Sequence, residues 1–444
     1  MYMNNIDLLK IVDVKHIKAF MMCLKVKINI FLLLLSFASC YQPERLTNIS
    51  TNYRAYNFSS LYNPSESYLH PEYFIYLESE NLAKFYFRIK TSELKKIRPN
   101  LSDDKTVLSI KYVLRDNENN EIADSSTYHV RFNLETKNEY IDTYFKVKIP
   151  EEKNYRISVF LKGETPKHSK RILAYIDNSN PYSQNHFLIK SIDSLQQNIL
   201  TSNYVNTQKA YIIESENIDS LKIEFYKYSE YRVNLPYSSF KDIASAKADT
   251  CFRYKIGDSI IFANTGYYLL KNISDTQICF CLLSAGNSYP KILTVQDMIE
   301  PITLIATQRE YDTISRSNNL KIAIDNFWFS KSNNENFAKE QIRIFYSRVS
   351  LANEYFTDTQ QGWQTDRGNI YIIFGPPPTV NISDKGEEWF YGQNPDVASV
   401  IFSFEKDFNS VSTNTYRLLR DTQYQTIWAQ AVNTWRNGKI FSLN

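Results

Sequence analysis

Between residues 70 and 186, several short segments have an apolar residue at every second position. This alternation is the feature that most restricts how the chain folds. In one such segment a tyrosine and an arginine separate Phe85, Phe87 and Ile89, and lysines separate apolar residues in the same way over residues 145–149. Because successive side chains of a strand point to opposite faces of a sheet, each segment is expected to form a strand with one buried face. Polar turns between the segments predict an antiparallel β-sandwich over residues 70–186.

A second strand-rich block is expected over residues 205–306, after a polar and weakly helical connector at residues 191–203. The alternation is clearest from Leu221 to Phe225. We interpret the block as a second, smaller β-sandwich-like module. Neither module contains a catalytic cluster, so both are expected to act as spacers or binding surfaces.

Three cysteines lie in the second module, at Cys251, Cys279 and Cys281. Cys279 and Cys281 are two residues apart and would share one face of a strand. An oxidising compartment would permit one disulfide, between Cys251 and either of the other two. Buried thiols without a disulfide are the alternative.

The spacing of apolar residues changes near residue 307, from steps of two to steps of three and four. This change predicts a long helix over residues 334–355, with Asn333 or Asn334 as its N-cap, and a shorter helix before it at residues 314–330. A last helix is expected at residues 423–437, either packed on a small sheet or presenting tryptophans to a partner.

The most distinctive segment follows the long helix. We interpret its start as a turn in which Asp366 accepts backbone N–H groups and Gly368 takes a positive φ. The run Ile370 to Phe374 is apolar on both faces and predicts a central strand, which a glycine and three prolines would end. The segment consists of Gly362, Trp363, Gln364, Thr365, Asp366, Arg367 and Gly368, then the apolar run, then Gly375, Pro376, Pro377 and Pro378.

These residues resemble the motif of the GWxTD-domain family, envelope proteins found mainly in Bacteroidota and Acidobacteria. The resemblance covers about residues 310–410 and extends to Arg348, Glu388 and Trp389, which would serve as ligand-binding or structural residues. Pro378 departs from the family, in which an acidic or amide residue commonly follows the second proline. The resemblance implies an envelope lipoprotein with β domains in its N-terminal part, and it implies no particular reaction.

A chain of 444 residues is too long for one ordinary core, and a composition of 43% hydrophobic and 22% charged residues is typical of folded protein. The expected fold is therefore multidomain and mainly β. Two antiparallel β-sandwich-like modules precede a C-terminal α+β GWxTD domain, in which a helical segment is combined with a small sheet over residues 307–444.

The positions of the histidines limit the chemistry of the motif domain. The motif domain, residues 307–444, contains no histidine. It therefore cannot form a Ser-His-Asp or Cys-His nucleophile system or a histidine-based metal site. We therefore expect no enzymatic activity, no cofactor and no metal. The five histidines of the chain are His16, His70, His129, His168 and His186.

Two alternatives give the motif domain a ligand. Asp366 with Glu387 or Glu388 would act as acid and base in an envelope hydrolase or glycan-binding enzyme. Otherwise Arg348, Arg367 and Arg417 would converge on a carboxylate or phosphate through their planar guanidinium groups. The structural interpretation, which we favour, is a buried turn with an ion pair between Asp366 and Arg367.

The N-terminal segment has the pattern of a bacterial lipoprotein signal peptide. Lys25 and Lys27 precede an apolar run that ends in small residues before Cys40. Residues 1–39 are therefore expected to be removed, Met21 or Met22 being the real start, and the Cys40 thiol to be acylated. A plain cleaved signal or an uncleaved anchor is the alternative.

Residues 40–69 lack periodicity and predict a flexible tether. No acidic cluster follows Cys40, which favours the periplasmic face of the outer membrane. The formal charge of +3 disappears with residues 1–39, which contain five lysines and two aspartates. A neutral chain is not expected to bind nucleic acid. The expected partners are the lipid membrane, through Cys40, and an envelope protein that this binding or assembly module would recognise.

Overall fold

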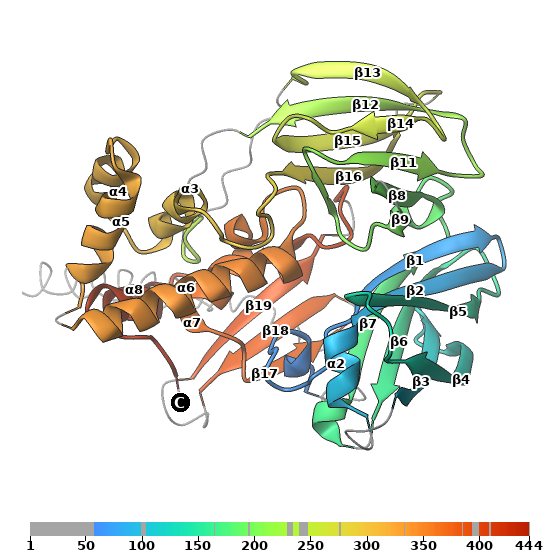
Figure 1. Ribbon diagram of the computed structural model, residues 1–444, viewed down its shortest axis with the longest axis horizontal. Coiled ribbons are helices and arrows are strands. Elements are labelled where there is room, and N and C mark those ends of the chain that lie inside the picture. The colour runs from blue at the N-terminus through green and yellow to red at the C-terminus, as the bar shows by residue number, and fades with distance from the viewer. Residues whose placement is uncertain are drawn as a thin grey trace, which may run out of the picture. The chain divides into compact units, whose positions relative to one another are not determined.

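A computed structural model describes residues 57–98, 104–163, 165–193, 196–228, 234–238, 247–274, 277–332, 334–383, 385–392, 399–407 and 410–443 (Figure 1). The described residues belong to one compact unit. The signal peptide and Cys40 lie outside the described residues. In the described part, no helix is long and apolar enough to cross a membrane.

The first module is an antiparallel β-sandwich, as the alternation predicts. Phe85, Phe87 and Ile89 are all buried in its core, between the two sheets. One sheet has the order β1-β2-β5 and the other β4-β3-β6-β7. The strands are β1 (Glu72–Ser79), β2 (Leu82–Lys90), β3 (Lys105–Asp116), β4 (Ile122–Asn133), β5 (Tyr140–Lys148), β6 (Asn154–Lys162) and β7 (Lys170–Asp177), with helix α2 (Thr91–Lys96) after β2.

The second module has two sheets of its own, in the orders β10-β16-β15-β12-β13 and β14-β11-β8-β9. Its strands are β8 (Leu188–Asp193), β9 (Gln196–Ile199), β10 (Tyr204–Asn206), β11 (Ala210–Glu214), β12 (Ser220–Lys227), β13 (Thr250–Lys255), β14 (Ser259–Ile261), β15 (Gly266–Asn272) and β16 (Ile278–Ala285). The weakly helical connector predicted at residues 191–203 is wrong, because β8 and β9 form a hairpin there. Polar residues are tolerated in these strands because β9 is the edge of its sheet.

The three cysteines of this module form no disulfide. In the sheet, Cys251 is paired with Glu224, Glu224 with Leu269, and Leu269 with Cys281. Three strand spacings of about 4.8 Å each therefore separate Cys251 from Cys281, far more than the roughly 7 Å that a disulfide can span between Cα atoms. The prediction of a bridge from Cys251 is wrong, and the alternative holds for Cys279 and Cys281, which are buried thiols.

The tether predicted for residues 40–69 is wrong for its described part, which begins at Asn57. Phe58 and Tyr62 are buried, and helix η1 (Ser59–Leu61) lies between them. The Phe58 amide donates to the Val380 carbonyl at 2.9 Å. Aromatic side chains in this segment give it an apolar surface to bury, which a flexible tether lacks.

The C-terminal domain packs helices against a small antiparallel sheet, as expected (Figure 1). Its long helix α6 (Glu335–Phe356) begins at the predicted N-cap, since the Asn334 side chain accepts from the amides of Asn336 and Phe337. The single helix expected at residues 314–330 is two helices, α4 (Gln308–Ser315) and α5 (Leu320–Phe329). The other elements are α3 (Val295–Ile299), η4 (Glu300–Leu304), η5 (Gly362–Gln364), α7 (Asp366–Phe374), β17 (Thr379–Ile382), β18 (Gly386–Tyr391), β19 (Val400–Lys406), β20 (Tyr416–Leu418) and α8 (Tyr424–Arg436).

The final helix is present at the predicted place, and it packs rather than presenting its tryptophans. Trp428 and Trp435 are both buried in the core of the domain. The Trp435 indole donates to the carbonyl of Ile373 at 3.0 Å, which joins α8 to the end of α7.

The central strand predicted at Ile370 to Phe374 is wrong, because these residues belong to helix α7. Every residue from Arg367 to Phe374 is buried. A short run that is apolar on all sides fits a buried helix as well as a central strand, so periodicity alone could not separate the two. Gly375, with φ of 92°, ends the helix in the conformation that glycine adopts most easily.

Candidate functional site

The GWxTD motif forms the tight connection between helices α6 and α7. Gly362 lies so close to α6 that a Cβ atom there would be 2.0 Å from the Ala352 carbonyl oxygen. Trp363 is buried, its amide donates to the Asn353 side chain at 3.0 Å, and its indole donates to the Gln361 side chain at 2.8 Å. The first two motif residues therefore hold the connection against the long helix.

Thr365 starts helix α7. Its hydroxyl donates to the Gly362 carbonyl at 2.8 Å and accepts from the Gly368 amide at 3.1 Å, which is the arrangement of an N-cap. Gly368 is required for space, since a Cβ atom there would be 1.9 Å from the same carbonyl. The predicted Asx-type turn at Asp366, with a positive φ at Gly368, is wrong, because the threonine performs the capping and Gly368 is a helical residue.

The loop after β16 completes this connection. The Tyr289 hydroxyl accepts from the Gly362 amide at 3.2 Å and is hydrogen-bonded to the Thr357 hydroxyl. The Asn353 side-chain amide donates to the Pro290 carbonyl at 3.1 Å. The motif is thus held by residues about 70 positions earlier in the chain.

Asp366 connects α7 to the segment after β19. One carboxylate oxygen accepts from the Leu418 amide at 2.9 Å, and the other accepts from the Arg420 guanidinium. Its side chain is 9% exposed, and burial raises its pKa despite the opposing effect of Arg420. The ion pair predicted between Asp366 and Arg367 is wrong, because each of the two residues pairs with a different partner.

Arg367 forms a buried ion pair with Glu387, at 3.1 Å, and both side chains are 3% exposed. The same guanidinium donates to the Asn414 side-chain oxygen at 2.6 Å, and it lies 3.9 Å from the centre of the Tyr416 ring. The Glu387 carboxylate also accepts from the Tyr62 hydroxyl at 2.7 Å and from the Trp389 indole at 2.9 Å. Both charges are therefore satisfied within the protein.

The three arginines proposed to share a ligand do not converge. Arg348 donates to the Ile372 carbonyl at 3.0 Å, at the C-terminal end of α7, where its positive charge complements the helix dipole. Arg367 belongs to the first turn of the same helix, five residues and roughly 7.5 Å along the axis from Ile372, and its guanidinium binds Glu387 and Asn414 instead. Arg417 pairs with Asp407 at 2.9 Å and is exposed.

The carboxylates proposed as acid and base do not meet at a cleft. The side chains of Asp366 and Glu387 are 9% and 3% exposed and are bonded to separate arginines, while Glu388 points to the opposite face of β18 from Glu387. Trp389, on the buried face, packs against Phe404 with ring centres 4.8 Å apart. In the described part of the chain, no group of three or more His, Cys, Asp or Glu side chains is arranged to hold a metal.

Lys406 lies beside the buried ion pair. Its amine donates to the Thr413 carbonyl at 2.8 Å and lies 3.9 Å from the centre of the Tyr175 ring, in the first β module. Burial, together with the charge of Arg367, lowers the pKa of Lys406 from 10.5 to about 7. The unfolded chain therefore binds a proton between pH 7 and 10.5 that the folded chain has released, so this residue makes folding more favourable as pH rises through that window.

We predict that Lys406→Met reduces the rise in the free energy of unfolding between pH 7 and pH 9. One such residue contributes at most about 1.4 kcal/mol per pH unit. Lys170, whose pKa burial lowers to about 8, maintains part of the slope in the variant. Urea denaturation across this pH range measures the effect, with Lys95→Met, the change of an exposed lysine on α2, as the control. An unchanged slope in Lys406→Met would contradict the assignment.

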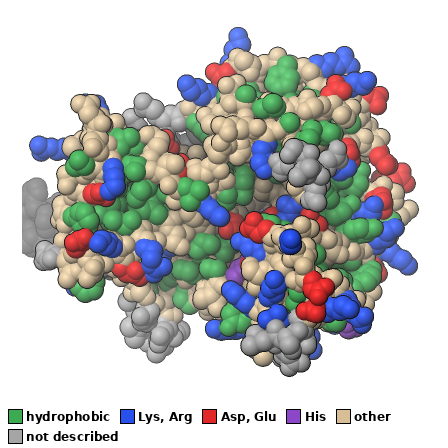
Figure 2. Space-filling model, in the orientation of Figure 1, with side chains coloured by type: hydrophobic (Ala, Val, Ile, Leu, Met, Phe, Trp, Pro, Cys, Tyr) green, Lys and Arg blue, Asp and Glu red, His purple; other side chains and the backbone are tan. Residues whose placement is uncertain are grey.

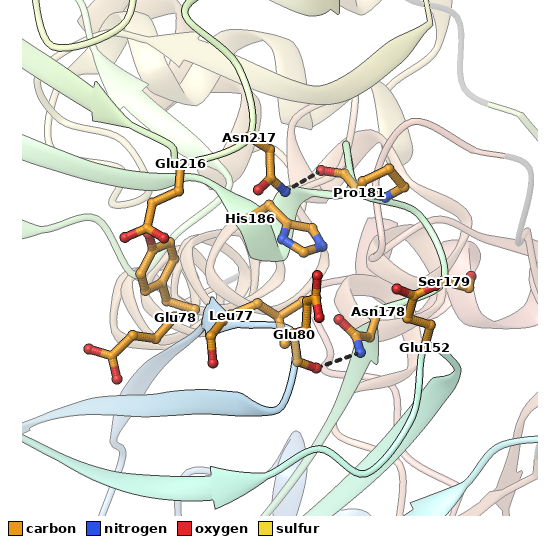
Figure 3. Close-up of a pocket in the computed structure, with 12 residues that line it drawn as sticks. Leu77, Glu78, Glu80, Glu152, Asn178, Ser179, Pro181, His186, Glu216 and Asn217 are labelled. Carbon is orange, nitrogen blue, oxygen red and sulfur yellow. Dashed lines mark hydrogen bonds between the residues drawn. The ribbon is translucent and has the colours of Figure 1, made fainter.

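A separate cavity of about 220 Å³ lies away from the motif, at the end of β1. Figure 3 shows the His186 ring between Asn217 and Glu80, with Glu216 on the opposite wall from Asn178. The Asn217 side chain donates to the Pro181 carbonyl at 2.9 Å and thereby fixes the loop after β11 against the cavity. Four glutamates and no lysine or arginine are among the residues that line it, so the cavity favours cations over anions.

Most partners of the motif could not be found from the sequence. Four residues outside the motif form hydrogen bonds to it, namely Tyr62, Tyr289, Asn414 and Arg420. The sequence around each of them has no pattern that predicts this contact. Asn353 is the exception, because it interrupts the apolar stripe of α6 at a position that faces the core. A buried amide on an apolar stripe signals a required hydrogen-bond partner.

A comparison of the sequence with models of known protein families finds a domain that includes both the motif and the loop bonded to it. The family model of the GWxTD domain matches residues 266–437, from the first residue of β15 to the end of α8. No curated protein matches the sequence. The match is longer than the resemblance at residues 310–410, and it includes β15, β16 and the loop with Tyr289. That loop belongs with the motif, since its tyrosine bonds to Gly362. The chain therefore contains a GWxTD domain, which occupies residues 266–437.

Proposed function

We propose that this protein is a lipoprotein of the outer membrane, anchored by acyl chains on Cys40 and facing the periplasm, where it acts as a binding or assembly module. Acyl chains on one cysteine would hold it stably, at about 0.8 kcal/mol per buried methylene. The basic and apolar segments before Cys40 support the anchor. An envelope protein is the expected partner, in a complex that handles outer-membrane or secreted proteins.

The binding role is supported by the burial and the bonding partners of the charged side chains in and around the motif. The side chains of Asp366, Arg367 and Glu387 are at most 9% exposed, and each is bonded to groups of the same chain. A catalytic acid or base must reach a substrate, whereas a structural ion pair must be satisfied internally. The arrangement favours a domain whose motif maintains its shape and whose surface binds a partner.

The anchor predicts the outcome of a single substitution. Cys40→Ser is expected to abolish incorporation of labelled palmitate and to release the protein from the membrane fraction, because the acylated thiol is lost. Cys23→Ser is the matched control, since Cys23 lies within the segment expected to be removed. A Cys40→Ser protein that still fractionates with membranes and still carries the label would contradict the proposal.

The binding role is tested by crosslinking in intact envelopes followed by purification of the full chain. A reproducible envelope protein, recovered with wild type and reduced with Cys40→Ser, is the expected result. Recovery of the lipoprotein alone, as a monomer in repeated preparations, would count against an assembly role.

A further inference from the structure

The outer face of the sheet β1-β2-β5 is unusually rich in aromatic side chains for a surface. The inner face of this sheet supplies the core of the first module, and the rings of the outer face lie outside that core. We call it the tyrosine face. It consists of Glu72, Phe74, Tyr76 and Glu78 on β1, Lys84, Tyr86, Arg88 and Lys90 on β2, and Tyr140, Asp142, Tyr144, Lys146 and Lys148 on β5.

Strand register arranges these side chains in rows across the sheet. Phe74, Tyr86 and Tyr144 form one aromatic row. On one side of it lies a row of Tyr76 and two lysines, and on the other side a row of Glu72, Arg88 and Asp142. Successive rows are about 6.8 Å apart, the rise of two residues in a strand. The face therefore alternates flat apolar rings with groups that form hydrogen bonds.

Two of the cations of the tyrosine face are paired with its carboxylates. Lys84 is bonded to Glu78, and Arg88 binds Asp142 at 2.6 Å. The Lys84 amine lies 5.5 Å from the centre of the Tyr144 ring, which restricts the orientation of that ring. Rings held in place before binding lose less conformational entropy when a ligand arrives.

The tyrosine face is open on its β5 side and bordered by the second module on the other. Tyr144 is 50% exposed. The Arg88 guanidinium donates to the Asn198 side chain at 3.3 Å, and the Thr201 hydroxyl donates to the Glu72 carboxylate at 2.8 Å. Figure 2 shows a hollow near the middle of the molecular face in view, with acidic and basic side chains gathered around it. The cavity of Figure 3 continues the tyrosine face, since Tyr76 and Glu78 line it.

The side chains of the tyrosine face fit some classes of ligand better than others. The lysines of the face would attract a polyanion, but Glu72, Glu78 and Asp142 would repel it, and Lys84 and Arg88 are already paired with two of these carboxylates. A protein interface requires a contiguous apolar centre from which charged residues are depleted, whereas here charged rows border the aromatic row on both sides. Hydroxyl groups both donate and accept, so lysines, arginines and carboxylates satisfy them equally well.

We infer that the tyrosine face binds a neutral oligosaccharide. The rings of Tyr86 and Tyr144, 5.4 Å apart, cover the apolar C–H faces of the sugar, and the charged rows on either side bind its hydroxyls. This inference rests on the proposed binding role, to which it adds a ligand class. It requires neither the lipid anchor nor the protein partner.

The test is calorimetric titration of the purified full chain carrying Cys40→Ser, with cellotetraose, chitotetraose and mannotetraose as probes. At least one probe is expected to bind. Tyr144→Ala is expected to weaken that binding by roughly tenfold or more, while Tyr144→Phe retains it because the ring remains. Tyr68→Ala is the matched control, a tyrosine of the same module that is 37% exposed and lies off the tyrosine face.

Absence of binding to all three tetrasaccharides would overturn the inference, and so would equal binding by the wild type and Tyr144→Ala. Heparin is the anionic comparison, and its binding in place of the neutral probes would assign the tyrosine face to polyanions instead. Failure of the glycan titration leaves the membrane fractionation and crosslinking results unaffected, so the two proposals fail separately.

Discussion

Alanine at position 362 is expected to prevent folding of the C-terminal domain under conditions where the wild-type chain is folded. The new Cβ atom would be 2.0 Å from the Ala352 carbonyl oxygen and 2.6 Å from the Asn353 Cα atom. Both are backbone atoms of α6, so the clash cannot be relieved by rotating a side chain. We expect a loss above about 4 kcal/mol, a large part of the roughly 5–15 kcal/mol that stabilises a domain.

Thermal unfolding followed by circular dichroism measures this effect, and another glycine provides the control. A Cβ atom at Gly286 would have no heavy atom within 4 Å. Gly286→Ala is therefore expected to change stability by at most about 1 kcal/mol, and in the favourable direction, because alanine restricts the unfolded chain. Gly362→Ala melting within a degree or two of Gly286→Ala would show that α6 and the motif are not in close contact.

Removing the charge of Arg367 is expected to cost about 3–5 kcal/mol, because it would leave Glu387 charged and unpaired in a buried position. Arg367→Met has a side chain of similar length that is able to pack among Phe356 and Tyr416. The unfolding free energy from urea denaturation is the quantity to compare. Lys321→Met, which breaks an exposed pair with Asp325, is the control and should cost less than about 1 kcal/mol.

A double-mutant cycle separates the ion pair from simple packing. Glu387→Gln alone should also destabilise, because the amide cannot neutralise the guanidinium. The double variant Arg367→Met/Glu387→Gln is expected to be less destabilised than the sum of the single changes, since no unpaired charge remains. Strict additivity of the two costs would refute the coupling.

The fold could be predicted where a local pattern determines it. Alternation identified strands such as β2 and β5 of the first module, and the stripe of α6 together with Asn334 identified the long helix and its start. Helix α7 could not be identified in this way. Its apolar residues face the core on every side, and that environment is created by α6, α8 and the small sheet, which are distant in sequence.

The motif predicted where the candidate site lies in the sequence, but it did not predict which residues the charged side chains of the site bind. The sequence places Asp366 next to Arg367, and adjacency favours an ion pair between them. In a helix, however, adjacent side chains point about 100° apart, so each finds a partner on a different element. Those partners, Arg420 and Glu387, are 54 and 20 residues away. Tertiary packing determines pairs so far apart in sequence, and no local sequence pattern indicates them.

The docking of residues 57–62 has a mechanical consequence. Asn57 and Phe58 are hydrogen-bonded to Pro378 and Val380, at the edge of β17, and the Tyr62 carbonyl accepts from Tyr371 on α7 at 2.9 Å. Tension applied to the chain ahead of Asn57 therefore reaches the GWxTD domain before it reaches the β-sandwich that comes next in sequence. The order in which the parts bear load differs from their order along the chain, and the contacts of Asn57 and Phe58 with β17 would be the first to yield.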